Sequence, residues 1–102
     1  MVNRGKLVRD KIPAIIEAQG RKPSFCILDD AQYAQELARK LDEEVREFHA
    51  DKNLEELADI LEVIFALAEA SGCSREELTQ TYQEKHDSRG GFEKRYFLIS
   101  KE

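Results

Sequence analysis

Two long stretches of the chain carry apolar residues at every third or fourth position, the spacing that places side chains on one face of an α-helix. They span residues 31–50 and 54–71, and only the polar turn DKN at residues 51–53 separates them. Helices joined by so short a turn lie antiparallel and side by side. The pattern therefore predicts a helical hairpin in the middle of the chain.

Polar residues mark the ends of these two helices. Either Asp29 or Asp30 can cap the first, and Asn53 can cap the second, because their side chains accept hydrogen bonds from the first free backbone N–H groups. Gly72 suits the left-handed conformation that ends a helix. These residues predict where the hairpin helices start and stop.

Two further helices are expected on either side of the hairpin. Residues 10–20 begin with Asp10 as a candidate N-cap and end at a glycine. After the hairpin, Ser74 and Glu77 have the spacing of a capping box, which predicts a last helix through about Asp87.

Two segments have the composition of β-strands. PSFCIL at residues 23–28 and RYFLIS at residues 95–100 are rich in aromatic and β-branched residues. We expect them to pair as a ribbon on the helices, because two strands alone are marginally stable. The expected fold is mainly α, an antiparallel helical hairpin or four-helix-bundle-like domain with a small two-stranded β ribbon. Residues 1–102 are expected to form a single domain, since domains commonly hold about 100 to 150 residues.

Acidic residues interrupt the apolar faces of both hairpin helices. On the second helix, Glu56 lies inside the apolar arc and Asp59 at its edge, about 60° away. On the first helix, Glu44 and Glu47 have the same arrangement. A buried carboxylate costs several kcal/mol unless it is protonated, paired or bound to metal. These four acids therefore need a partner.

The turn between the helices brings the four acids together. Reflecting the sequence about the middle of the turn places Glu47 opposite Glu56, and Glu44 opposite Asp59. Four carboxylates this close repel one another unless a cation is present, and oxygen ligands select Mg²⁺, Mn²⁺ or Ca²⁺ over zinc. The alternative is a solvated surface in which such acids pair with nearby lysines and arginines. Two mirrored pairs favour the metal site, and we expect Glu43, Glu55, Glu62 and Glu69 to form the solvated face.

Four motifs resemble a known enzyme superfamily. LDEEVREF at residues 41–48 and ELADILEV at 56–63 resemble the MazG-like all-α nucleotide pyrophosphohydrolases. KLVRDKIP at residues 6–13 and KHDSRGGF at 85–92 resemble the short branch of that superfamily that is similar to phosphoribosyl-ATP pyrophosphohydrolase.

The resemblance implies an activity. It implies Mg²⁺-dependent cleavage between the α and β phosphates of a nucleoside triphosphate or related nucleotide, giving a monophosphate and pyrophosphate, with Mn²⁺ as a possible substitute. It also implies homodimers or tetramers with the active site near a subunit interface. The acids that match its metal-binding and catalytic positions are Glu44, Glu47, Glu56 and Asp59. Glu47 and Glu56 are the leading candidates for orienting or deprotonating the attacking water.

Basic residues could bind the phosphates. Lys85 and Arg89 lie one helical turn apart near the end of the last predicted helix, before two glycines. The alternative is that they only complement the helix dipole. The resemblance also implies a phosphate-facing role for Lys6 and Arg9. We expect the aromatic residues to be mainly in the core: Phe25, Tyr33, Tyr82, Phe92 and Phe97.

Composition and charge narrow the function classes. The net charge of −5 argues against binding to a nucleic acid polymer, which usually requires a basic face. There is no run of about 18 apolar residues and no apolar signal region in MVNRGKLVRD, so we expect neither a membrane protein nor a secreted one, but a cytoplasmic one.

The second hairpin helix is apolar over about 200° of its circumference. So wide an arc needs cover on several sides, which a chain of 102 residues can hardly supply. We therefore expect at least a homodimer with this helix in the interface. Two alternatives to the general pyrophosphohydrolase stay open: hydrolysis of phosphoribosyl-ATP in histidine biosynthesis, and a non-catalytic oligomerisation module that senses a nucleotide.

Overall fold

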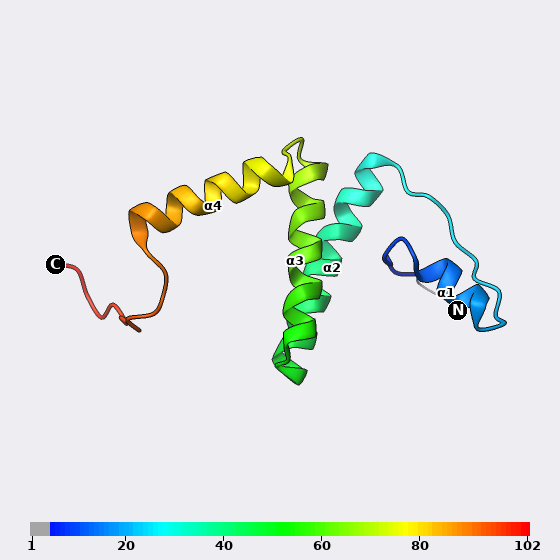
Figure 1. The fold of residues 1–102 in the computed structure, drawn as a ribbon, viewed down its shortest axis with the longest axis horizontal. Coiled ribbons are helices and arrows are strands. Elements are labelled where there is room, and N and C mark those ends of the chain that lie inside the picture. Colours follow the sequence, from blue (N-terminus) through cyan, green and yellow to red (C-terminus); the bar gives the residue numbers. More distant parts are fainter. Residues whose placement is uncertain (1–4) are drawn as a thin grey trace.

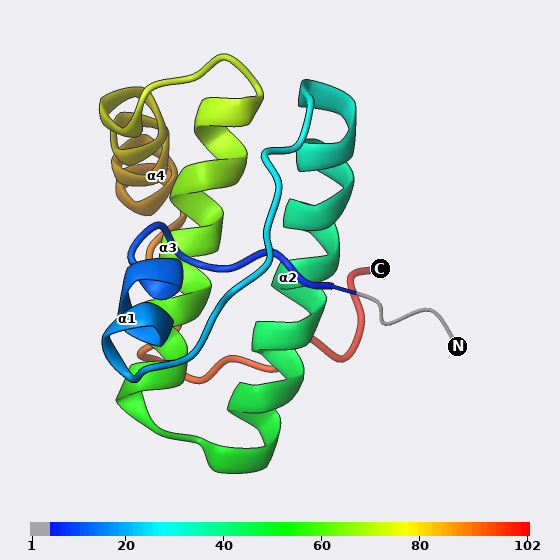
Figure 2. The ribbon, with the colours of Figure 1, turned by 90° about the vertical axis from the view of Figure 1, so that its right-hand side faces the viewer.

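The computed structural model describes residues 5–102, which form four α-helices joined by loops. Helices α2 (Asp30–Asp51) and α3 (Leu54–Ala70) form an antiparallel hairpin (Figures 1 and 2). The short α1 (Ile12–Ala18) lies beside the hairpin, and α4 (Arg75–Arg89) extends away from it (Figure 1). The prediction of a mainly helical fold is confirmed.

The hairpin helices are capped as the sequence indicates. Asp29 is the N-cap of α2: its carboxylate accepts a hydrogen bond from the Gln32 backbone N–H at 2.8 Å, and its own N–H donates to the Gln32 side chain at 3.3 Å. Asn53 caps α3 by accepting from the Glu56 N–H at 3.0 Å. Between the helices, Lys52 adopts the left-handed conformation with φ of 52°, which closes the turn.

The ends of α3 and α4 are also close to those expected. Gly72 follows α3 with φ of +90°, a conformation that a residue with a Cβ rarely adopts. Ser74 and Glu77 form the predicted capping box at the start of α4. Helix α4 ends at Arg89, two residues beyond the expected Asp87.

The prediction that Asp10 caps the first helix is wrong. The Ile12 N–H donates to the Arg9 carbonyl at 3.0 Å, so Asp10 lies inside a turn that precedes the helix. The N-cap position belongs to Lys11, which makes no capping hydrogen bond with its side chain. Asp10 is therefore one residue too early to cap the helix.

The predicted β ribbon is wrong, because none of residues 5–102 forms a strand. The segments 23–28 and 95–100 lie at opposite ends of the long axis of the molecule, which measures 59 Å (Figure 1). Helix α4 extends about 22 Å at 1.5 Å per residue and carries the C-terminal segment away from the hairpin. Strong β propensity in each segment cannot pair two backbones at this separation.

The interior of the protomer is small. Leu37 and Val63 are the buried apolar residues of the described chain, with 2% and 7% of their surfaces exposed. The radius of gyration is 17.8 Å, whereas a compact domain of this length has one of about 13 Å. The expectation that most aromatic residues are in the core is wrong here, because one chain offers them no cover. The exposed ones are Phe25, Tyr82, Phe92 and Phe97.

Among residues 5–102, no helix has the length and apolar content needed to cross a membrane.

Candidate metal and phosphate site

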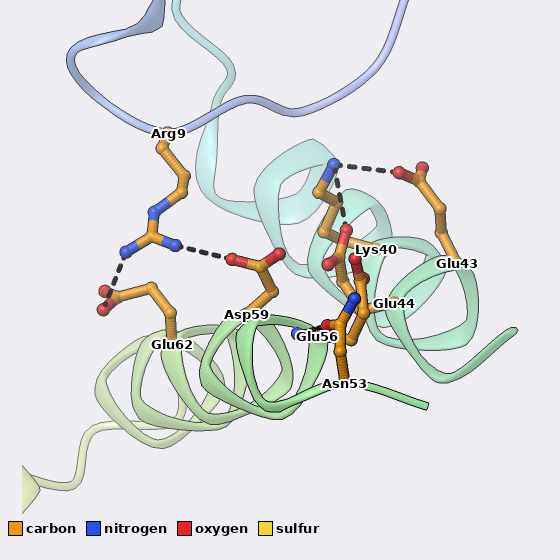
Figure 3. Close-up of polar contacts among 8 residues, drawn as sticks. All are labelled: Arg9, Lys40, Glu43, Glu44, Asn53, Glu56, Asp59 and Glu62. Carbon is orange, nitrogen blue, oxygen red and sulfur yellow. Dashed lines mark hydrogen bonds and ion pairs between the residues drawn. The ribbon is translucent and has the colours of Figure 1, made fainter. Parts of the chain in front are cut away.

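Three of the four predicted acids meet where α2 and α3 face each other (Figure 3). Glu44 on α2 and Glu56 and Asp59 on α3 each offer a carboxylate oxygen, and these three oxygens lie within 4.8 Å of one another. A second group joins Glu44 to Glu43 and Glu47 on α2, again within 4.8 Å. Because Glu44 belongs to both groups, the four predicted acids form one continuous cluster.

Two oxygens of this cluster are buried without a partner. Glu44 has only 5% of its surface exposed, and neither its Oε2 nor the Oε2 of Glu56 accepts a hydrogen bond. An unsatisfied buried carboxylate oxygen is costly, and one remedy is a metal ion. The donor set contains only carboxylate oxygens, the ligands that Mg²⁺ and Mn²⁺ prefer. The residues present therefore fit a hard divalent cation.

The surroundings raise the pKa values of Glu44, which is buried, and of Glu56, which is half-buried. Burial is the largest cause of the raised pKa of Glu44, followed by the negative charge of Glu47, while Lys40 opposes the shift. The pKa of Glu56 is also raised, first by desolvation and then by the charges of Glu47 and Asp59. The metal-free cluster is thus a site where additional positive charge is favourable.

Two basic side chains contact the cluster from different elements (Figure 3). Arg9, on the segment before α1, donates from Nη1 to Oδ1 of Asp59 at 2.9 Å, and its Nη2 lies 3.6 Å from Glu62. On α2, the Nζ of Lys40 lies 3.1 Å from Glu43 and 3.6 Å from Glu44. These cations partly neutralise the acids but leave the two buried oxygens without partners.

A cavity of about 250 Å³ opens beside the acids. Its polar lining combines Glu44, Asp59 and Glu62 with three basic residues, Lys6, Arg9 and Lys40. A larger cavity of about 610 Å³ continues between the residues around α1 and the hairpin. Its walls are partly apolar, formed by Ile12, Ile15, Tyr33, Leu37 and Ala66. Acids, bases and an apolar space therefore adjoin one another.

The structure brings some of the predicted phosphate-binding residues to the site and not others. Lys6 and Arg9 line the smaller cavity. Lys85 and Arg89 line neither cavity, since α4 extends away from the hairpin (Figure 1). They are therefore not part of the site that this chain forms.

Sequence reasoning also missed three members of the site. One is Glu62, which was expected on the solvated face but pairs with Arg9 and lines the smaller cavity. Glu43 was expected on the solvated face, yet it is half-buried and belongs to the cluster. Lys40 was not singled out, although it precedes Glu43 by three residues and Glu44 by four, the spacings at which helical side chains meet. That spacing could have identified it.

Replacing Arg9 with glutamine is expected to raise the affinity of the nucleotide-free protein for Mn²⁺ several-fold. The substitution removes a positive charge 2.9 Å from Asp59 that competes with the metal for this carboxylate. Stability should change by less than about 1 kcal/mol, because both ion pairs of Arg9 are exposed. Calorimetric titration measures the affinity. The control is Arg39→Gln, which removes an ion pair with Glu36 on α2, and neither residue belongs to the acidic cluster. Equal or weaker Mn²⁺ binding by the Arg9 variant would contradict the competition.

Comparison with known proteins gives little further information. The chain is 51% identical over 45 residues to an uncharacterized protein of Mycolicibacterium smegmatis, covering 44% of this chain and 46% of that protein. The match thus spans less than half the length of this relative. The sequence matches no family model. No solved structure is significantly similar to it.

Proposed function

We propose that this chain is a Mg²⁺-dependent nucleotide pyrophosphohydrolase of the MazG-like all-α type, with Mn²⁺ as a possible substitute for Mg²⁺. It would cleave the bond between the α and β phosphates of a nucleoside triphosphate or related nucleotide. The observation that carries this proposal is the carboxylate cluster on α2 and α3, with its two unpartnered buried oxygens beside a cavity lined by basic residues.

The residues divide into three roles. Glu44, Glu56 and Asp59 would hold the metal, because their oxygens converge. When bound, Mg²⁺ would supply neutralisation of the phosphate charge and of the leaving pyrophosphate, and would acidify the attacking water. Glu47 is exposed at the edge of the cluster and makes no ion pair with any residue of 5–102, so it is the acid best able to orient or deprotonate that water. Arg9 and Lys6 would bind phosphate oxygens.

The larger cavity would hold the nucleoside. Its volume of about 610 Å³ is within the range of about 300 to 1,000 Å³ for small-molecule sites, and it adjoins the smaller cavity through Arg9, Ile12 and Lys40. The ring of Tyr33 and the apolar side chains around it offer a surface for a base. The phosphates would then point toward the acids.

Self-association belongs to the same proposal. A homodimer or tetramer with α3 in its interface would cover apolar surface that one chain leaves exposed. The proposed place of action is the cytoplasm, where nucleotides and Mg²⁺ are available.

A screen for pyrophosphate release tests the proposed function. The purified protein is incubated with Mg²⁺ and a panel of standard and damaged nucleoside triphosphates, with phosphoribosyl-ATP included. Release from members of the triphosphate panel is expected. Turnover of phosphoribosyl-ATP alone would favour the histidine-biosynthetic reaction. Calorimetric binding of a nucleotide without release would indicate a sensor, and an absence of Mg²⁺ or Mn²⁺ binding with or without nucleotide would overturn the proposal.

A further inference from the structure

The chain exposes far more surface than a compact monomer. Its accessible surface is 9451 Å², whereas the scaling for folded monomers gives about 5,900 Å² for a chain of this mass. Permanent dimers bury about 2,000 to 5,000 Å² in total, and the excess of about 3,500 Å² per chain can supply an interface of that size.

One part of this excess is an apolar stripe along α3, formed by Leu54, Leu57, Leu61 and Ile64, which we call the α3 stripe. These residues follow one another at steps of three or four, so they share one face of the helix. At 100° per residue, this face points away from Asp59 and Glu62. Covering the stripe would therefore leave the acidic cluster and its cavity open.

The other part is the C-terminal arm, residues 92–100. Five of its large apolar residues are exposed, with Phe92 at 97% and Ile99 at 90%. The others are Tyr96, Phe97 and Leu98. A segment with this many solvated apolar side chains requires cover elsewhere.

The net charges of helix α3 and of the arm have opposite signs. Helix α3 carries five acidic residues and no lysine or arginine. The arm, residues 92–100, carries two basic residues, Lys94 and Arg95, and one acid, Glu93. At 100° per residue, every acid of α3 lies at least about 60° from the stripe, so the opposite net charges would favour the approach of the arm without forming ion pairs along the stripe.

We propose that the C-terminal arm of each protomer packs on the α3 stripe of a second copy of this chain. The inference rests on the self-association proposed above and is independent of the proposed reaction. Helix α4 carries the start of the arm about 22 Å away from its own α3 (Figure 1). An arm of nine residues spans at most about 30 Å when fully extended. Most of that length would be needed to cross the distance back to its own α3. It would reach only the nearer end of that stripe and leave Leu54 and Leu57 uncovered.

The first test replaces apolar side chains of the arm with charged ones and leaves every helix unchanged. The double variant Phe97→Asp with Ile99→Asp is compared with the natural chain by sedimentation equilibrium in the absence of nucleotide. The dissociation constant of the dimer should rise at least about 100-fold, since each arm loses two large apolar contacts. Ser100→Ala, a change at the end of the arm that removes neither an apolar side chain nor a charge, is the control. Helical circular dichroism should stay unchanged because the arm contains no helix. A monomeric natural chain, or an unchanged dissociation constant in the variant, would overturn the proposal.

The second test identifies which copy the arm contacts. In a background with Cys26→Ser and Cys73→Ser, which removes the two exposed natural thiols, one protein carries Leu61→Cys and a second, larger-tagged protein carries Phe97→Cys. Mixing and oxidation should give a disulfide-linked heterodimer. The control replaces Leu61→Cys with Gln80→Cys on exposed α4 and should give little of this product. A disulfide that forms only when both cysteines are on one chain would show that the arm folds back on its own helix and would refute the exchange. Neither test measures pyrophosphate release, so failure here and failure of the proposed function are separate results.

Discussion

Replacing Glu56 with glutamine is expected to lower pyrophosphate release at least about 100-fold, because the substitution removes a carboxylate from the metal-binding set. Mn²⁺ binding measured by calorimetry should fall in parallel. The fold should be retained, since the capping hydrogen bond at this position is made by the Glu56 backbone N–H and not by its side chain. Asp59→Asn is expected to have a similar effect.

Glu55→Gln is the matched control for this variant. Glu55 is the preceding residue on α3, is exposed and belongs to neither group of converging carboxylates. It should keep its pyrophosphate release and metal affinity within about a factor of two, since surface changes away from a site have small effects. Equal losses in both variants would mean that the helix terminus, and not the cluster, is responsible.

The metal-free protein is expected to lose stability as the pH rises from about 4.5 toward neutrality. The pKa values of Glu44 and Glu56 lie above 4.5 in the folded state, so the folded chain holds protons that the unfolded chain has released. Their contribution is fully present below about 4.5 and is lost as the pH rises through the folded-state pKa values. Thermal melting at a series of pH values with a chelator measures this dependence.

Mg²⁺ should reverse that loss at neutral pH, because it binds the ionised carboxylates. A ligand that binds only the folded state, at a free concentration 100 times its dissociation constant, adds about 2.7 kcal/mol to the free energy of unfolding. The glutamine in the variant Glu44→Gln cannot ionise. The melting temperature of this variant should therefore depend less on pH and should rise less on addition of Mg²⁺. Melting temperatures of the metal-free protein that increase over this pH range would contradict the assignment of the raised pKa values to the cluster.

Local signals in the sequence were sufficient to predict the helical hairpin and the convergence of its acids. The caps at Asn53 and Ser74 depend on contacts three residues apart, which the sequence contains completely. The convergence of Glu44 with Glu56 and Asp59 follows from helix periodicity and the length of one turn. Chemical roles for these acids stay predictions.

Features that depend on distant segments were not predictable in the same way. The ion pair of Arg9 with Asp59 joins residues 50 positions apart, and only the path of the chain around α1 brings them together. The β ribbon failed for the same reason, since composition describes each strand but not the distance between them. The position of Lys85 and Arg89 depends on the direction in which α4 leaves α3, which no periodicity specifies.

The hairpin over residues 29–71 carries its own caps at Asp29 and Asn53 and all four of the acids. The flanking segments supply Arg9, one side of the larger cavity and the arm. The proposed metal chemistry would thus depend on the hairpin, whereas the proposed nucleotide site would draw on both the hairpin and its flanks. Sequence changes confined to the flanks would then alter one side of the proposed nucleotide site and the proposed assembly, while the hairpin kept all four acids.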